Sequence, residues 1–418
     1  MKRAAIAVSM SLSMAPSAAF AVDWAVKATQ SETVEANSNQ FLATIPAGTL
    51  GSYTTLSTNF EAKMPDSKFD FDADGTYRKY WGPGTVNTSE SEFTNWGFKA
   101  HYETDEKYNF DKEFIEATWR QQSTALALLN DLGISSNVSG ALDRLTATGG
   151  IDRSLSARDS LNLLATSTFT SYEPSSGGTS FTDTLGRATW RHSLSSVTAL
   201  TASSEVELLN YDNAFGTNVE ILRNQVGVQA TLSPVLSFRG EAGAVNLFTQ
   251  NGVGTSQSIT FGSPSTALPI SSSVTDWIGD AVLTYKMFKD TTFTLNAAQS
   301  VGPTIVGSLL KRDLIAAGLA YTINKQSTLT FSANWNRQIF LTSTTDYTAA
   351  SVTYGYNLTQ EWTAQLTYRY LHRFASTGTT TIEPITNTPI TSGTGPADSH
   401  SIMVVVSHSY TALPHGSY

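Results

Sequence analysis

The sequence predicts an all-β fold, a single transmembrane antiparallel up-and-down β-barrel of about 18 strands. Two observations predict it. Long segments alternate apolar and polar residues with a period of two, which gives each strand two chemically different faces. The strands also follow one another in pairs, with very short turns at one end and longer polar loops at the other, which is the asymmetry of transmembrane barrels.

The first residues are typical of a secretory signal rather than of a folded domain. A cationic start precedes an apolar stretch, and the small residues ending Ala19-Phe20-Ala21 match an Ala-x-Ala cleavage site. The alternative is a membrane anchor, but serines interrupt a run that is already too short to span a bilayer. We expect residues 1–21 to be a cleaved signal peptide and residues 22–418 to form one barrel domain.

The composition favours a β-barrel wall with one apolar face and one polar face. Charged residues make up 15% of the chain, which is low for a water-facing surface, while aromatic residues make up 11%. The length would also fit two or more soluble domains. No segment after the signal approaches an uninterrupted apolar run long enough for a helical span. The net charge of −9, without a basic run, argues against nucleic acid as a partner.

The short turns follow in chain order and are rich in polar residues, Pro, Asp and Asn, which suits hairpins. They centre on Pro65–Ser67, Thr104–Lys107, Ser154–Arg158, Ser195–Ser196, Ser233–Pro234, Lys289–Asp290, Asn324–Gln326 and Thr359–Glu361. Between the pairs lie longer loops, the first near Asn37–Thr49, and notably Gln121–Ala141, Gln250–Ser273 and Ala375–Ser399. Leu126–Leu132 is a candidate helix within one loop. An even strand count places both termini on the side of the short turns, which is the periplasmic side in such barrels.

The alternation is clearest in three late strands. From Trp362 to Phe374 and from Leu329 to Leu341, apolar and polar residues alternate, and only Arg337 departs from the pattern on the greasy face. The last strand turns Ile402, Val404, Val406, His408 and Tyr410 outward. Its near-terminal aromatic resembles the recognition signal of the barrel-assembly machinery, although the tail Thr411–Tyr418 departs from the usual pattern.

Aromatic residues gather near both ends of the predicted strands, as in the interfacial belts of membrane proteins. Near the short turns these are Trp24, Trp190, Tyr285, Tyr321 and Trp362, and near the long loops they are Trp81, Trp96, Trp119, Tyr172, Tyr211, Trp277 and Tyr370. The alternative is a soluble β-sandwich, propeller or β-helix, but such folds lack the asymmetry between short turns and long loops.

The N-terminal half resembles a family of β-barrel porins associated with exopolysaccharide gene clusters. The similar segments are Ser31–Asn37 and Phe71–Tyr80, which read SETVEAN and FDADGTYRKY. The resemblance implies an outer-membrane pore that assists polysaccharide export, in contact with polysaccharide-export components.

If the apolar positions face lipid, the opposite positions line the lumen. The candidate pore-lining residues are Asp70, Asp72, Asp74, Arg78, Lys99, His101, Glu103, Asp111, Glu113, Arg187, Arg191, Glu205, Glu207, Arg223, Arg239, Glu241, Arg369 and Arg373. Acidic positions cluster early and arginines are spread through later strands, which predicts an acidic wall opposite a more basic one. Such charges could select permeating solutes, or they could form ion pairs that brace the barrel. The loops beginning at Gln121 and Gln250 are candidate plugs.

Enzyme and metal sites are not expected. The six histidines are scattered without a serine and carboxylate at a known spacing, and loop serines such as Ser175 are ordinary turn residues. Asp70-x-Asp72-x-Asp74 resembles the start of a calcium loop but lacks the later glutamate. We therefore expect no catalytic residues, no metal and no cofactor.

The sequence predicts a porin-like channel in the bacterial outer membrane, which passes polar solutes or assists polysaccharide export through a charged lumen. Its expected partners are outer-membrane lipid, lipopolysaccharide and the barrel-assembly machinery. The alternative is an adhesion or structural barrel whose loops bind at the cell surface.

Overall fold

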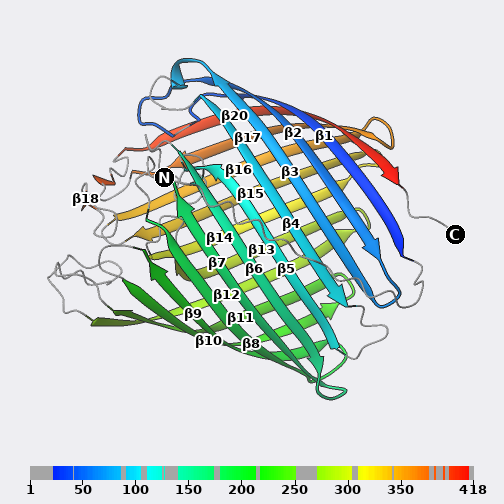
Figure 1. The fold of residues 1–418 in the computed structure, drawn as a ribbon, viewed down its shortest axis with the longest axis vertical. Coiled ribbons are helices and arrows are strands. Elements are labelled where there is room, and N and C mark those ends of the chain that lie inside the picture. Colours follow the sequence, from blue (N-terminus) through cyan, green and yellow to red (C-terminus); the bar gives the residue numbers. More distant parts are fainter. Residues whose placement is uncertain are drawn as a thin grey trace, which may run out of the picture.

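The computed structural model describes residues 22–40, 42–85, 91–104, 111–124, 127, 140–173, 179–212, 217–250, 271–303, 309–340, 343–375, 381–382, 389–390 and 395–413. Within these residues, 18 antiparallel strands form one closed sheet. Each strand pairs with its neighbours along the barrel, and the last strand pairs with the first. Figure 1 shows the strands crossing the wall obliquely, with β1 and β20 close to each other where the barrel closes. The predicted up-and-down barrel and its strand number are confirmed.

The strands follow the predicted order. The first nine are β1 (Asp23–Asn37), β2 (Thr49–Lys63), β3 (Ser67–Trp81), β4 (Glu92–Thr104), β5 (Asp111–Ser123), β6 (Ala141–Ser154), β7 (Asp159–Tyr172), β8 (Phe181–Ser193) and β9 (Thr198–Tyr211). The others are β10 (Asn218–Ser233), β11 (Leu236–Gln250), β12 (Ser271–Phe288), β13 (Thr291–Pro303), β14 (Leu309–Thr322), β15 (Ser327–Phe340), β16 (Ser343–Asn357), β17 (Trp362–Arg373) and β20 (Ala397–Leu413). A 3₁₀ turn, η1 (Pro83–Thr85), follows β3.

The short turns join β2 to β3, β4 to β5 and so on to β16 and β17, where the sequence predicts them. Their polar residues close the hairpins by backbone bonds: the Met64 amide donates to the Ser67 carbonyl at 2.8 Å, and the Leu358 amide donates to the Trp362 carbonyl at 2.9 Å. Residues 105–107 of one predicted turn lie outside the described residues. We call this end of the barrel the short-turn rim and the opposite end the long-loop rim.

The connections at the long-loop rim vary more than the sequence predicts. Residues 341–342 alone separate β15 from β16. Within the predicted loop Ala375–Ser399, β18 (Thr381–Ile382) pairs with β19 (Pro389–Ile390). The predicted signal segment, most of the loops Gln121–Ala141 and Gln250–Ser273, the candidate helix Leu126–Leu132 apart from Ala127, and Ser175 lie outside the described residues.

The outer face of the wall carries exposed apolar side chains on every side of the barrel. Leu56 is 58% exposed, Ile115 67% and Val226 69%, although a water-soluble protein buries such side chains in its core. The aromatic residues predicted near the short turns are all exposed on this face. An apolar outer wall on a closed barrel is what a bilayer requires, because no backbone group remains unpaired in lipid.

Two of the predicted belt residues face inward instead. Tyr211 pairs with Phe181 across β8 and β9, and both belong to a buried apolar cluster on the inner wall. Tyr172 packs against the same cluster. Their positions near the long-loop rim suit a belt, but the register of β7 and β9 turns them toward the lumen.

None of the described residues forms a helix that is long and apolar enough to cross a membrane.

Candidate functional site: the lumen

Contacts that skip strands show which face of the wall is the lumen. Arg223 on β10 donates through Nη2 to the Val301 carbonyl on β13 at 2.7 Å, and Arg369 on β17 donates to Glu35 on β1 at 3.3 Å. Side chains on separated strands can meet in this way only inside the curved wall. Charged residues therefore concentrate on the inner face, opposite the exposed apolar residues.

Most of the predicted lumen residues lie on this inner face by the register of their strands. These are Asp70, Asp72, Asp74, Arg78, Lys99, His101, Glu103, Arg187, Arg191, Glu205, Glu207, Arg223, Arg239, Glu241, Arg369 and Arg373. Whether they line a conducting pathway stays a prediction.

The structure places Asp111 and Glu113 differently. Both share the face of Ile115 and Trp119, whose side chains point outward, so the prediction that they face the lumen is wrong. The first residues of β5 are charged on both faces, so the local sequence does not show which of them face the lumen. The apolar Phe114 points inward because Gly150 leaves room for its ring: a Cβ at Gly150 would lie 2.3 Å from the Phe114 ring.

The expected acidic wall does not form, because the predicted Lys99 and two cations that the sequence analysis missed, Lys68 and Lys112, lie between the early carboxylates. Lys112 ion-pairs with Glu103 at 2.9 Å, and Lys99 pairs with Glu116 at 2.8 Å. Lys68 similarly lies 3.1 Å from Asp70. Once it is known which alternate residues of β5 face the lumen, Lys112 and Glu116 can be identified as inner residues. The positive and negative side chains in this part of the lumen therefore nearly balance one another, and the wall is not acidic.

The strongest ionic network lies on β8, β9 and β10. Glu205 and Glu207 are 4% and 3% exposed, and Arg223 bridges them. Arg187 also donates through Nε to Glu205 at 2.6 Å. Buried carboxylates require such partners because an unpaired buried charge is costly. Arg223 also binds the Val301 carbonyl, so the network joins the wall to β13.

The ends of β13 and β14 at the long-loop rim fold into the lumen. The pairing of β12 with β13 stops at Gly279 and Gln299, whereas β13 continues to pair with β14 up to Pro303 and Leu309. Val301 and Leu309 then pack into the apolar cluster on the inner wall, whose other members are Phe181, Leu209, Tyr211, Val219, Ile221, Val245, Leu247 and Ile278. We call this segment, residues 299–303 and 309–312, the inward hairpin end.

An ion pair ties the inward hairpin end to the wall. Lys311 Nζ on β14 lies 2.6 Å from Asp276 Oδ2 on β12, and both side chains are largely buried. The inward hairpin end narrows the lumen from one side. The prediction that the loops beginning at Gln121 and Gln250 plug the lumen stays a prediction, because most of their residues lie outside the described ones. No alternation or composition signal marks the inward hairpin end, because its inward turn depends on the apolar inner surface of β8–β12 against which it packs.

A polar cavity of about 530 Å³ occupies the other side of the lumen. It lies between β1–β3 on one side and β15–β17 with β20 on the other, and its lining includes Arg78, Arg369, Tyr53 and a row of amides on β15 formed by Asn334, Asn336 and Gln338. The row of amides follows from the period of two, which brings alternate residues to one face. A volume of this size accommodates a small polar solute.

Glu35 organises the wall of this cavity. It is 4% exposed, and it accepts hydrogen bonds from the Tyr53 hydroxyl, from Asn37 Nδ2 at 3.2 Å and from Arg369 Nη2 at 3.3 Å. Arg78 lies 5.1 Å from the centre of the Tyr53 ring. Among the described residues, no carboxylate lies within ion-pairing distance of Arg78. The cavity thus presents a cation that the barrel itself does not neutralise, and neither Glu35 nor Tyr53 was predicted.

A serine, an aspartate and a histidine meet near the short-turn rim, but not in the order of a nucleophilic site. Ser156 Oγ donates to Asp159 Oδ2 at 2.6 Å, and His192 Nδ1 lies 2.8 Å from Asp159 Oδ1. A nucleophilic serine needs the imidazole next to its hydroxyl. Here the Ser156 hydroxyl also accepts hydrogen bonds from the backbone amides of Arg158 and Asp159, so these three side chains stabilise the turn between β6 and β7.

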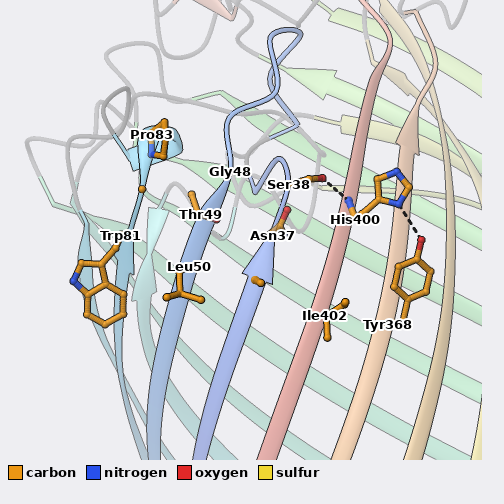
Figure 2. Close-up of a pocket in the computed structure, with 12 residues that line it drawn as sticks. Asn37, Ser38, Gly48, Thr49, Leu50, Trp81, Pro83, Tyr368, His400 and Ile402 are labelled. Atoms are coloured by element: carbon orange, nitrogen blue, oxygen red, sulfur yellow. Dashed lines mark hydrogen bonds between the residues drawn. The ribbon is translucent and has the colours of Figure 1, made fainter.

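The outer wall carries a second cavity near the long-loop rim, of about 580 Å³. Leu50, Trp81, Tyr368 and Ile402 line it together with the backbone that follows β1 and β3, and Figure 2 shows these side chains along neighbouring strands. We call this cavity the rim groove.

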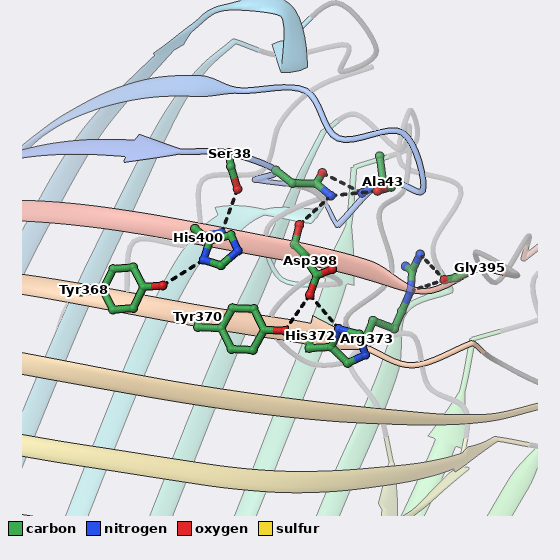
Figure 3. A network of polar contacts seen from close by, with 10 residues as sticks. Ser38, Ala43, Tyr368, Tyr370, His372, Arg373, Gly395, Asp398 and His400 are labelled. Atoms are coloured by element: carbon green, nitrogen blue, oxygen red, sulfur yellow. Dashed lines mark hydrogen bonds and ion pairs between the residues drawn. The ribbon is translucent and has the colours of Figure 1, made fainter.

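A polar network borders the rim groove on β17 and β20 (Figure 3). The hydroxyl of Tyr368 lies 2.9 Å from His400 Nδ1, and Tyr370 donates to Asp398 at 2.7 Å. His372 Nδ1 lies 2.7 Å from the same carboxylate oxygen. Aromatic rings with a polar partner suit the interface between lipid and water. Among the described residues no cluster of His, Cys, Asp or Glu could hold a metal ion.

No protein-family model matches the chain, and no curated protein matches it in sequence. Solved structures with a similar shape include OccAB2 of Acinetobacter baumannii, with 9% identity, a TM-score of 0.46 and coverage of 93% of this chain and 98% of that one. The FrpB iron transporter from Neisseria meningitidis has 7% identity, a TM-score of 0.47 and coverage of 93% and 81%. The ferric-catecholate import receptor Fiu from E. coli K12 has 9% identity, a TM-score of 0.45 and coverage of 92% and 81%. The fold is shown by the strand pairing of this chain itself, a closed sheet of 18 antiparallel strands within the described residues.

Proposed function

We propose that the chain is a bacterial outer-membrane channel that passes small polar solutes through its lumen. The polar cavity carries this proposal: Arg78, Arg369 and the amides of β15 face one another across a space of about 530 Å³ inside a closed barrel. The apolar outer wall supports the location, since closed barrels of this kind span outer membranes. The inward hairpin end supports selectivity, because it narrows the lumen opposite the cavity.

Conductance across a planar bilayer tests the proposal. Refolded protein should insert with stepwise conductance, and Arg369→Glu should shift the ion selectivity toward cations because it reverses a charge exposed in the lumen. Arg337→Glu is the matched control, since Arg337 lies on the outer face of β15 beside Asp346. We expect this control to leave the reversal potential unchanged.

Two results would contradict the channel. The first is a folded barrel that never conducts, even when the contacts of the inward hairpin end are removed. The second is an equal shift of the reversal potential in both arginine variants. Polysaccharide export rests on the resemblance of the N-terminal half and stays a separate prediction, which a deletion strain with normal surface polysaccharide would refute.

A further inference from the structure

A charged side chain lies on the outer face of the wall about two thirds of the way along β1, well inside the strand rather than at its end. Glu32 on β1 is exposed and shares the outward face with Gln30 and Val34. Other charged side chains on the outer face of the described strands lie toward one rim or the other, as Glu92 and Asp159 do at the ends of their strands. Glu32 is therefore the exception that needs a physical reason.

The strand register gives the depth of this side chain. A row of laterally paired residues on the outer face begins at Trp362 on β17, beside a short turn. It continues through His408, Gln30, Leu56 and Gly75 and ends at Trp96 on β4, toward the long-loop rim. Gln30 thus lies between the two aromatic belts, and Glu32 is its next neighbour on the same face. Both are at the depth of the hydrocarbon core.

The surroundings of Glu32 are polar but provide no cation. Glu32 Oε1 accepts a hydrogen bond from Gln30 Nε2 at 3.2 Å, and Oε2 accepts one from Thr54 Oγ1 at 2.8 Å. Each carboxylate oxygen can accept more, and no described lysine or arginine lies within ion-pairing distance of it. Lipid tails cannot supply the missing donors, so a lipid-facing Glu32 would be destabilising.

The neighbouring outer-face residues of β1 and β2 are also polar, so together with Glu32 they form a polar surface. We define the polar patch as Gln30, Glu32, Ser52, Thr54 and Thr58, which the pairing of β1 with β2 brings together. On β3, Thr58 pairs with the small Ala73, whereas Thr54 and Ser52 pair with the larger Tyr77 and Lys79. The ring of Trp96 covers Gly75, so the patch is flanked by both small and large side chains.

We propose that the polar patch is the contact surface of a two-fold dimer of this chain in the membrane. The patch contains both kinds of group, because the amide of Gln30 and the hydroxyl groups can donate and the carboxylate of Glu32 accepts. Two copies inserted in the same orientation and related by an axis along the membrane normal present the patch at the same depth. The second amide hydrogen of Gln30 and the hydroxyl groups of Ser52 and Thr58 in one copy can then donate to the carboxylate of the other, which is the self-complementarity of an isologous interface. The rim groove lies on the same strands toward the long-loop rim, so it borders the same contact surface (Figure 2).

Cysteine crosslinking in native membranes tests the dimer, because the chain has no cysteine of its own. Leu56→Cys introduces one thiol beside Gln30 without removing a polar group of the patch. Val226→Cys is the matched control, since Val226 is similarly exposed on the outer face of β10, across the barrel. Oxidation or a short bis-maleimide linker should give a covalent dimer for Leu56→Cys at least about tenfold above the control. Adding Glu32→Leu should abolish the excess while leaving the folded, heat-modifiable barrel intact.

Three results would overturn the dimer. The first is equal crosslinking of the two cysteine variants. The second is crosslinking that is unchanged by Glu32→Leu. The third is a monomeric mass in lipid nanodiscs together with a raised unfolding temperature of Glu32→Leu, which would show that lipid covers the patch. Single-channel conductance of Glu32→Leu should equal that of the parent chain, so the test is independent of the proposed transport.

Discussion

At the scale of single residues, Arg223 connects more of the lumen than any sequence pattern indicates. Its guanidinium bridges the buried carboxylates of Glu205 and Glu207 and also holds the Val301 carbonyl. One planar cation with five donors can satisfy three acceptors in this way. The sequence analysis predicted Arg223 as a lumen residue, but only as one of several arginines spread along the chain.

We expect Arg223→Ala to destabilise the barrel by about 3–5 kcal/mol, because it leaves two buried carboxylates without their shared cation. Unfolding by urea in lipid vesicles measures the effect. The matched control is Arg239→Ala on the neighbouring strand, whose side chain is 56% exposed and pairs with Asp280. Its cost should stay within about 1 kcal/mol, because exposed pairs contribute little. Similar costs for both variants would contradict the importance of the network.

At the scale of elements, the inward hairpin end narrows the lumen. Two contacts of different kind hold it: apolar packing of Val301 and Leu309 on the inner wall, and the ion pair of Lys311 with Asp276. As a result, the long-loop end of β12, before Gly279, does not pair with β13. A strand pair that leaves the wall in this way forms a constriction without any long loop.

We expect the double substitution Val301→Ser and Leu309→Ser to raise the single-channel conductance, because it removes the apolar contacts that hold the hairpin end inside the lumen. The matched control is Leu295→Ser and Ile315→Ser on the outer face of the same two strands. That control should leave the conductance of inserted channels unchanged. A conductance of the Val301 and Leu309 variant equal to that of the parent would mean that the hairpin end does not restrict the pathway.

At the scale of the whole molecule, closure of the barrel depends on β20, which pairs along its length with both β17 and β1. Removing residues 397–418 would leave β17 and β1 as open edges, whose unpaired backbone groups lipid cannot satisfy. We expect that truncated chain to refold without the heat-modifiable gel mobility of a closed barrel. Removal of residues 414–418 alone keeps every pair of β20, so this shorter truncation should retain the mobility. A heat-modifiable band from the longer truncation would show that the barrel closes without the pairing of β20 with β17 and β1.

Much of the fold could be read from the sequence because its signals are local. The alternation from Trp362 to Phe374 fixes both faces of β17 whatever its neighbours are, and the polar turn at Asn324–Gln326 marks a hairpin without reference to the rest of the chain. The lumen parity of Arg369 and Arg373 follows from the same pattern. The prediction was wrong at Asp111 and Glu113, where charges on both faces erase the alternation.

The strands, their number, the short turns and most of the inner face can be inferred from local sequence patterns, because a period of two is a property of each strand alone. Which charges meet depends on the folded barrel, since Lys112 and Glu103 or Glu35 and Arg369 become neighbours only through the register of paired strands and the closure of the barrel. The folded barrel also determines that β13 and β14 leave the wall and enter the lumen. That turn depends on the apolar inner surface of β8–β12, which exists only after the strands have closed into a curved wall.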